Sequence, residues 1–411
     1  MTTRIALILI VAVLGASTAA AEPPPANEPA PPTDEEMTLA KGNTQFALEL
    51  HRQLTAAPAD NLFTSPLSIS TALAMTYAGA RGNTATEMAR TLHFAAEGDQ
   101  LHAAFAKLLH GLEPLPEADG YRLKLANALW LHQGYSFLPE FLQIGQTQYA
   151  AGLHTVDFVN ALEPARQSIN TWVAQRTEDK IRELIPPGIL DAQTRLVLTN
   201  AIYFKGQWAR RFEERATREA PFTLADGTQV SVPLMHQTGE MAYLERNGLQ
   251  VLELPYAGER LSMVVLLPRA ADGLPALEGS LEPPRLAELL SSLRQREVQV
   301  FLPRFMLRSA VRLDNTLQAM GMRDAFRAGA ADFSGMDGTR DLYIGAVLHE
   351  AFVEVNEQGT EAAGATAVVQ KIRAAPTERP VFRADRPFLF LIRDVRSGSV
   401  LFLGRLANPR A

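Results

Sequence analysis

The stretch that decides the fold lies near the C-terminus, where residues 356–376 have the sequence NEQGTEAAGATAVVQKIRAAP. It follows an alternating apolar run at 346–357 that predicts a β-strand. Its two glycines and its β-branched residues disfavour a helix. It also lacks the large apolar side chains that an ordinary core strand packs against its neighbours. The stretch therefore needs an explanation that neither regular element supplies.

Alternate residues of this stretch separate into two unlike faces. If the chain is extended, one face carries only small, uncharged residues, namely Thr360, Ala362, Gly364, Thr366 and Val368. Within 360–369 the sole charge, Glu361, falls on the opposite face. Such a segment can enter a crowded sheet with its small face covered and Glu361 in water. It also suits an exposed loop, but long loops without regular structure are uncommon in compact domains and are usually functional.

The composition is that of a globular protein, with 47% hydrophobic and 20% charged residues among 411. The formal net charge is −6 and no dense Lys/Arg segment occurs, so we expect neither nucleic acid nor an anionic membrane as a partner. The chain has no cysteine, so burial of the core must stabilise it without disulfides. Its eight histidines lack ligand spacing, so we expect no metal.

The N-terminal segment differs from the rest of the chain. Residues 1–21 combine Arg4, a short apolar run and small residues, which is typical of a secretory signal peptide. We therefore expect a secreted protein, extracellular or periplasmic; a retained membrane anchor is the less favoured alternative. Residues 22–36 form a proline-rich tether. Helix and strand patterns then continue without another linker, so we expect one domain over 37–411.

The order of the patterns predicts the fold class. Ser65 followed by Pro66 predicts a helix start, and the sequence from Thr84 to Glu87 matches a capping box that would open the next helix. Strand patterns follow at 121–131, 195–208, 261–268, 297–305, 346–357, 387–394 and 399–406. Helices first and many strands later indicate an α+β protein with large antiparallel or mixed sheets.

Two polar residues lie on otherwise apolar strand faces. Alternation places Asn200 on the apolar face of the 195–208 strand and His349 on that of the 346–357 strand. A buried polar group without a partner costs about 1–3 kcal/mol, so each side chain needs one. They can bond to each other or be satisfied separately, and the pattern alone favours separate partners.

Successive blocks of the chain resemble the signatures of the serpins, the serine protease inhibitors. The segment 357–367 is similar to the hinge of the serpin reactive loop. The other blocks follow in the order of the family, at 61–88, 199–208, 302–305, 313–326, 331–336, 348–363 and 382–394. Together they extend from about residue 37 to residue 409.

The resemblance implies a serpin fold with three β-sheets, eight to nine helices, an exposed reactive loop at about 357–380 and a metastable native state. It also implies an inhibitor rather than an enzyme. In this family a protease attacks the loop and forms an acyl-enzyme, and the cleaved loop then inserts into the main sheet and traps the protease. The small face of 360–368 favours an inhibitory member.

The same resemblance assigns roles to particular residues. The hinge comprises Glu357, Gly359, Thr360, Glu361, Ala362, Ala363, Gly364 and Ala365. The shutter beneath the main sheet comprises Ser65, Ser68, Asn200 and His349, which now favours a direct contact between the last two. Trp208 and Arg304 belong to the breach, where insertion begins, with Arg304 as the basic partner of Glu357.

The family register places the reactive bond between Arg373 and Ala374. An arginine before the scissile bond fits the acidic pocket of trypsin-like serine proteases. Lys371 is the fallback and Arg379 is less favoured, while a cysteine protease stays an alternative target. We expect a monomer without cofactor. We also expect no glycosaminoglycan partner, because 101–112 offers Lys107 as its only lysine or arginine.

Two rival interpretations are a non-inhibitory serpin, acting as a carrier or chaperone, and a hydrolase. Non-inhibitory members tend to lose the small-residue hinge, which this chain keeps. A hydrolase of the common α/β type needs a Gly-x-Ser-x-Gly motif, which the chain lacks.

Overall fold

The computed structural model describes residues 31–56, 60–113, 120–360 and 379–410, without the side chains of 124–126, 200, 201 and 203. Residues Pro32–Ala411 form one compact unit. The described residues contain ten α-helices: α1 (Asp34–Leu54), α2 (Pro66–Tyr77), α3 (Gly82–Leu92), α4 (Gly98–Leu112), α5 (Pro139–Tyr149), α6 (Leu162–Arg176), α7 (Leu274–Ser280), α8 (Pro283–Ser291), α9 (Asp314–Ala319) and α10 (Ser334–Asp337). The count exceeds the expected eight to nine because it includes very short helices such as α10.

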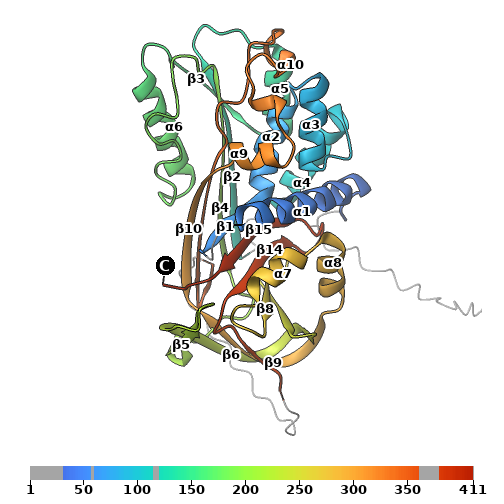
Figure 1. Cartoon of the computed structure of the whole chain (residues 1–411), viewed down its shortest axis with the longest axis vertical. Helices are drawn as coiled ribbons and strands as arrows, with labels where there is room; N and C mark the ends of the chain where they lie inside the picture. Colours follow the sequence, from blue (N-terminus) through green and yellow to red (C-terminus); the bar gives the residue numbers. More distant parts are fainter. Residues whose placement is uncertain (1–30, 57–59, 114–119, 361–378, 411) are drawn as a thin grey trace, which may run out of the picture. The chain divides into compact units, whose positions relative to one another are not determined.

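Among the described residues, six strands form the main sheet, which runs through the unit in Figure 1. Its order is β10 (Phe305–Arg312), β11 (Leu348–Asn356), β12 (Gly359–Thr360), β4 (Leu196–Gln207), β2 (Tyr121–His132) and β3 (Gly152–Val156). All neighbours are antiparallel except β2 and β3, which are parallel. Two long strands from distant parts of the sequence, β4 and β11, thus lie on either side of the two-residue strand β12.

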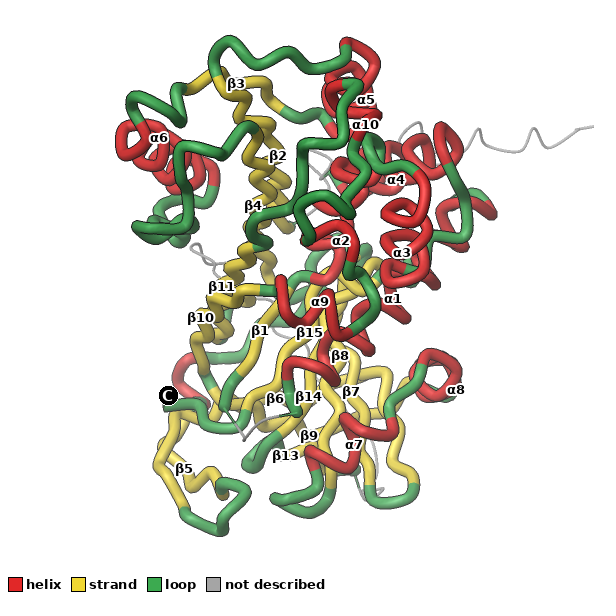
Figure 2. The backbone as a smooth tube through the Cα atoms, turned by 45° about the horizontal axis from the view of Figure 1, so that its top comes forward, coloured by secondary structure: helices red, strands yellow, loops and turns green. Residues whose placement is uncertain are grey.

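The remaining nine strands form one hydrogen-bonded network in the order β1 (Leu62–Thr64), β15 (Val400–Leu406), β14 (Phe388–Asp394), β8 (Leu261–Pro268), β7 (Leu249–Pro255), β6 (Gln229–Arg246), β9 (Arg294–Pro303) and β13 (Val381–Arg383), with β5 (Arg218–Thr223) also on β6. The long β6 joins two sheets, because its residues 242–246 pair with β7 and its residues 234–243 pair with β9. With the main sheet this gives the three sheets that the resemblance implied. Figure 2 shows this strand-rich region beside the main sheet.

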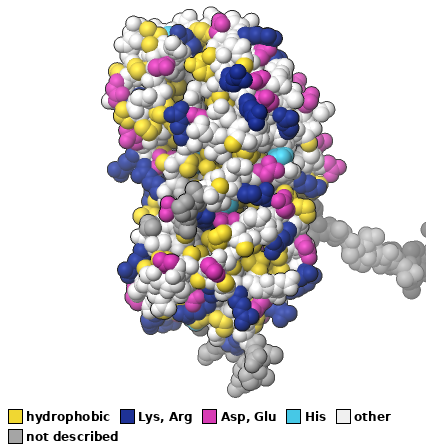
Figure 3. Space-filling model, in the orientation of Figure 1, with side chains coloured by type: hydrophobic (Ala, Val, Ile, Leu, Met, Phe, Trp, Pro, Cys, Tyr) yellow, Lys and Arg dark blue, Asp and Glu magenta, His cyan; other side chains and the backbone are white. Residues whose placement is uncertain are grey.

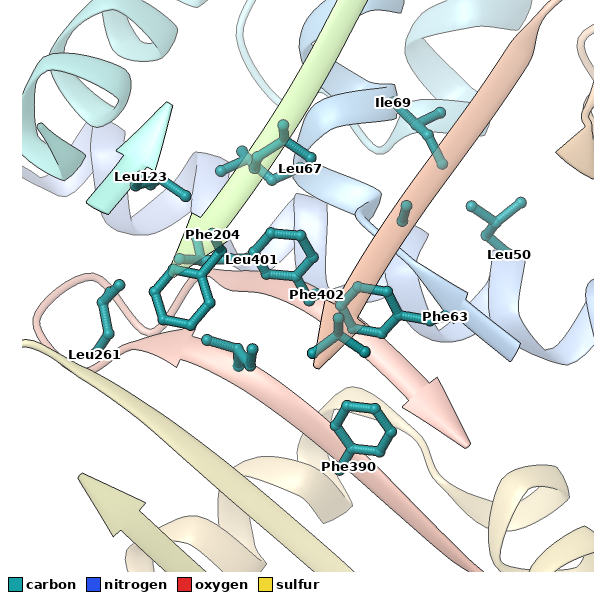
Figure 4. Close-up of a cluster of buried hydrophobic side chains, with 14 of the residues drawn as sticks. Leu50, Phe63, Leu67, Ile69, Leu123, Phe204, Leu261, Phe390, Leu401 and Phe402 are labelled. Carbon is teal, nitrogen blue, oxygen red and sulfur yellow. The ribbon is translucent and has the colours of Figure 1, made fainter. Parts of the chain in front are cut away.

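Aromatic rings in the core pack the main sheet against a second sheet, the one that contains β1, β15 and β14. Phe63 of β1 stacks on Phe390 and Phe402, with ring centroids 5.8 and 5.2 Å apart. Phe204 of β4 reaches the same cluster, 5.9 Å from Phe402 (Figure 4). Each fully buried ring of this kind stabilises the fold by about 1.5–3 kcal/mol relative to an exposed one. This cluster therefore holds β4, the strand that borders β12, against the second sheet.

One local prediction is confirmed and another is wrong. Ser65 caps α2 as predicted, and Pro66 is its first residue. Residues 84–87 do not form the predicted capping box, because α3 already begins at Gly82. Thr84 instead accepts a hydrogen bond from the Asp332 amide at 3.0 Å, and the Glu87 carboxylate accepts one from the Arg323 amide at 2.7 Å. These side chains join α3 to a distant segment rather than to its own first turn.

The surface carries both signs of charge. On the face visible in Figure 3, Lys and Arg side chains are interspersed with Asp and Glu side chains. Within the described residues, we find no helix with both the length and the apolar character needed to cross a bilayer.

Candidate functional site: hinge, breach and shutter

The first part of the predicted hinge, Gly359 and Thr360, enters the main sheet as the two-residue strand β12. Thr360 pairs with Val355 of β11 on one side and with Gly206 of β4 on the other. Gly359 pairs with Asn356 and with Gln207 in the same way. The chain therefore leaves β11, turns, and starts a new strand between β11 and β4.

Beyond β12, the facing edges of the two long strands pair with no strand among the described residues. Along 196–205, β4 pairs only with β2, and along 348–354, β11 pairs only with β10. Among the described residues, no ladder joins β4 directly to β11. An unpaired edge presents a row of N–H and C=O groups that a further strand can bind. We refer to 196–205 and 348–354 as the unpaired edges.

Only glycine fits at the first position of β12. A Cβ atom on Gly359 would lie 1.9 Å from the Gly206 carbonyl oxygen and 2.7 Å from the Gln207 Cα. Its φ of +151° is also rarely adopted by residues with a side chain. The close approach of the two backbones therefore depends on the missing side chain.

The second position of β12 is buried and hydrogen-bonded. Thr360 is 1% exposed, and its hydroxyl lies 2.8 Å from the Tyr256 hydroxyl. Burial raises the pKa of Tyr256 well above its usual range, so the phenol is neutral. Thr360 therefore occupies a neutral, enclosed position.

Trp208 fixes the turn between β11 and β12. Its indole Nε1 donates to the Asn356 carbonyl and its backbone N–H donates to the Gln358 carbonyl, both at 3.0 Å. The indole also stacks on Tyr256, with centroids 4.7 Å apart and planes at 12°. The predicted breach residue thus contacts both ends of the turn and the partner of Thr360.

Glu357 lies in the same turn, and the structure places it against Arg304. The Arg304 Nε lies 2.6 and 2.7 Å from the two Glu357 carboxylate oxygens, and the Thr217 hydroxyl also donates to this carboxylate. The Glu357 side chain is 4% exposed, whereas that of Arg304 is 42% exposed. A nearly buried carboxylate therefore depends on one half-exposed arginine and one hydroxyl. Arg304 itself separates β9 from β10, which the sequence had joined in one run at 297–305.

Two of the predicted shutter residues, Ser65 and His349, meet where α2 begins. The backbone N–H of Ser65 donates to the His349 Nε2 at 3.0 Å, and the Ser65 hydroxyl donates to the Leu401 carbonyl at 2.8 Å. Burial lowers the pKa of His349 to about 4, so its ring is neutral at pH 7. Because Nε2 accepts a hydrogen bond, the ring proton is assigned to Nδ1. The imidazole thus bridges β11 to the start of α2.

The remaining shutter predictions are placed only in part. Ser68 is buried beside Ser65, and its backbone N–H donates to the Ser65 hydroxyl at 3.3 Å. Asn200 lies in β4 opposite Asn127 of β2. Its side chain lies outside the described part of the chain, as does the predicted Asn200–His349 contact.

The rest of the loop lies outside the described residues. This applies to the hinge residues Glu361, Ala362, Ala363, Gly364 and Ala365, to Lys371, and to the predicted reactive bond Arg373–Ala374. Arg379 is described, and its Nε lies 2.8 Å from Glu297.

Two residues of the site escaped the sequence analysis. Tyr256 directly follows β7, where it continues the alternation of Leu252 and Leu254, and Thr217 precedes β5. A buried tyrosine usually has a hydrogen-bond partner, which was the only available signal. The partner itself, a hinge residue about a hundred positions away, could not be found without the fold.

Comparison with known proteins agrees with this geometry. A family model described as "Serpin (serine protease inhibitor)" matches residues 41–409. The leukocyte elastase inhibitor of Homo sapiens is 45% identical over 380 residues, covering 90% of this chain and 99% of that protein. That of Xenopus tropicalis is 43% identical over 378 residues, with the same coverage.

Solved structures show the same fold. Uncleaved ovalbumin has a TM-score of 0.81 at 33% identity, covering 90% of this chain and all of that one. A loop-inserted, cleaved ovalbumin mutant has a TM-score of 0.82 at 31% identity, with equal coverage. The chain therefore belongs to the serpin family, as the resemblance indicated. It is a serine protease inhibitor rather than an enzyme.

The comparisons contradict the expectation of a secreted protein. The matched leukocyte elastase inhibitors are intracellular proteins without signal peptides. The expectation rested on the composition of residues 1–21 alone, and it was wrong.

Proposed function

We propose that this serpin is a suicide-substrate inhibitor whose cleaved loop inserts between β4 and β11. The observation that supports the proposal most strongly is β12, which already occupies the first two positions between the unpaired edges. A strand that continued from Thr360 would satisfy both edges with backbone hydrogen bonds. The residues that follow on the Thr360 face, Ala362 and Gly364, are small enough to lie under a sheet.

The chemistry follows from the loop as a substrate. The protease serine attacks the carbonyl carbon of Arg373, and the amine of Ala374 leaves with a proton, so that an ester joins the protease to the loop. Release of Ala374 frees the loop from the segment that continues to β13. Insertion then carries the ester away from its docking position before water hydrolyses it.

Arg373 supports a trypsin-like target, because its guanidinium matches an acidic specificity pocket. A second candidate comes from the relatives, which are named elastase inhibitors. It predicts a chymotrypsin-like or elastase-type protease and cleavage at a different bond. A cysteine protease is the third candidate. We propose a monomer that acts on one protease molecule at a time.

A protease panel separates these candidates. The inhibitor is mixed with trypsin, chymotrypsin, elastase and papain, and SDS-resistant complexes are counted on gels. Intact mass spectrometry then identifies the released C-terminal peptide. We expect a trypsin complex and a peptide that begins at Ala374. In Arg373→Ala this complex should disappear, while Arg379→Ala serves as the matched control. A complex with elastase alone would assign the reactive bond to a position other than Arg373–Ala374. Cleavage without any complex would favour the non-inhibitory alternative.

A further inference from the structure

A cavity of about 610 Å³ lies beneath the start of β4. Its walls come from α2, from the segment 184–195, from β4 and from the segment 333–349. This volume is within the range of about 300–1,000 Å³ of sites for small organic ligands. The cavity is adjacent to the shutter, because Ser68 and His349 contribute to its wall.

Most of the wall is apolar. Ile69 and Leu73 of α2 face it from one side, and Leu196 and Leu198 of β4 from another. The two β4 leucines are only half-buried although they lie in a central strand of the main sheet. Apolar side chains that stay partly exposed in this position would be stabilised by covering them, at about 25 cal/mol per Å².

One polar group in the wall lacks a partner. Ser68 is 1% exposed, and its hydroxyl makes no hydrogen bond with any described residue. A buried hydroxyl without a partner is unfavourable by about 1–3 kcal/mol. The neighbouring His349 ring is neutral and its Nε2 is already occupied by the Ser65 amide. Ser68 is therefore a hydrogen-bonding group that the buried end of the cavity offers to a ligand.

The charges of the wall favour a neutral ligand. Its ionised groups are Asp191, Arg195 and Asp341. Both aspartates are exposed. Arg195 donates to the carbonyls of Ala192 and Thr194. The buried end near Ser68 has no counter-charge, so an ionised ligand group there would carry a large desolvation penalty.

We propose that this cavity binds a neutral, mainly apolar molecule with one hydroxyl group, and that the hydroxyl pairs with Ser68. The ligand would lie beside Leu196 and Leu198, at the end of the unpaired edges remote from β12. It would then obstruct the last part of loop insertion. This regulatory step rests on the proposed inhibitory mechanism, whereas binding itself does not.

Binding is tested with the full chain and without protease. Diphenylhexatriene, a fluorescent hydrocarbon without hydrogen-bonding groups, reports occupation of the cavity, and dodecanol and dodecanoate compete with it. We expect saturable binding of the probe and displacement by dodecanol at least about tenfold more effective than displacement by dodecanoate. In Ser68→Ala, dodecanol should bind about five- to tenfold more weakly while the probe is unaffected. Equal competition by the two amphiphiles, or no effect of Ser68→Ala, would overturn the assignment.

Two substitutions that enlarge residues of the wall test where the probe binds. Gly345 lies in the wall, and a Cβ added there meets no atom within 4 Å. Gly345→Phe and Ala72→Leu should each weaken binding of the probe by about tenfold or more. Gly279→Phe is the matched control, because Gly279 has equally open surroundings but lies on α7. Unchanged binding in both Gly345→Phe and Ala72→Leu would show that the cavity is not the site.

Regulation is tested last, with a protease that the inhibitor traps. Saturating dodecanol should shift the products from covalent complex to cleaved inhibitor without slowing cleavage. An unchanged product ratio would reject regulation while leaving the binding result intact. If no protease is trapped even without dodecanol, the proposed function is wrong. The binding measurements then still decide whether the cavity binds the proposed ligand.

Discussion

Replacing Thr360 with arginine tests whether the second position of β12 must be small and neutral. In the intact protein Thr360 is 1% exposed and bonds to the fully buried Tyr256. A guanidinium in this place would lose several kcal/mol of solvation, and the Tyr256 hydroxyl would lose its partner at a further cost of about 1–3 kcal/mol. The intact variant avoids most of this penalty by withdrawing β12 from the sheet.

The cleaved variant has no such escape, because Thr360 heads the strand that must insert. A barrier raised by about 3 kcal/mol slows insertion roughly 100-fold. The protease then completes hydrolysis before it is trapped. We therefore expect Thr360→Arg to be cleaved normally and to yield cleaved inhibitor in place of SDS-resistant complex, measured by gel densitometry over time. Thr360→Ser keeps the hydroxyl and should keep the complex. An unchanged proportion of complex in Thr360→Arg would refute the assignment of β12 as the start of insertion.

Three further substitutions test the hinge, the breach and the shutter. Gly359→Ala should displace β12 and lower the free energy of unfolding by about 1–3 kcal/mol, because its Cβ would collide with Gly206. Arg304→Ala should lower the free energy of unfolding in urea by about 1–3 kcal/mol, because the buried Glu357 carboxylate loses its cation. In a double-mutant cycle, Arg304→Ala should have little effect when Glu357 is already replaced by Gln. His349 has a folded pKa of about 4 against about 6.5 in the unfolded chain, so its contribution is complete above pH 6.5 and is lost as the pH falls to 4. Stability should therefore decrease by about 3 kcal/mol over this range, and His349→Gln should flatten this part of the pH profile.

Controls accompany these tests. Gly345→Ala has free space around its Cβ and should change stability by less than about 0.5 kcal/mol. A comparable loss in Gly359→Ala and Gly345→Ala would contradict the steric argument. Additive effects of the Arg304 and Glu357 substitutions would contradict a direct ion pair. An acid profile that is equally steep in His349→Gln would assign the titration to another group.

The sequence predicted those parts of the fold that depend on local pattern. The 261–268 run became β8 within its predicted bounds, and Ser65 and Pro66 began α2. The prediction of one strand over 297–305 was wrong at Arg304, because strand periodicity does not reveal that the chain changes its partner strand there. The box at 84–87 failed for a similar reason, since Thr84 and Glu87 bond to a segment distant in sequence.

The site was predicted less fully than the fold. Strand alternation pointed to His349, and the family resemblance supplied Trp208 and Arg304. Their contacts depend on strands far apart in the chain. No sequence pattern pointed to the contact between Tyr256 and Thr360 or to the cavity below β4. Both arise from packing between elements, which a one-dimensional period does not contain.

The central claim is that β4 and β11 accept the cleaved loop as a new strand between them. Thermal unfolding of intact and protease-nicked inhibitor, followed by circular dichroism, tests it most directly. Insertion should raise the unfolding midpoint by at least about 10 °C, equivalent to about 8 kcal/mol for a unit of about 380 residues. A nicked protein that unfolds at or below the midpoint of the intact one would show that the loop does not enter the sheet.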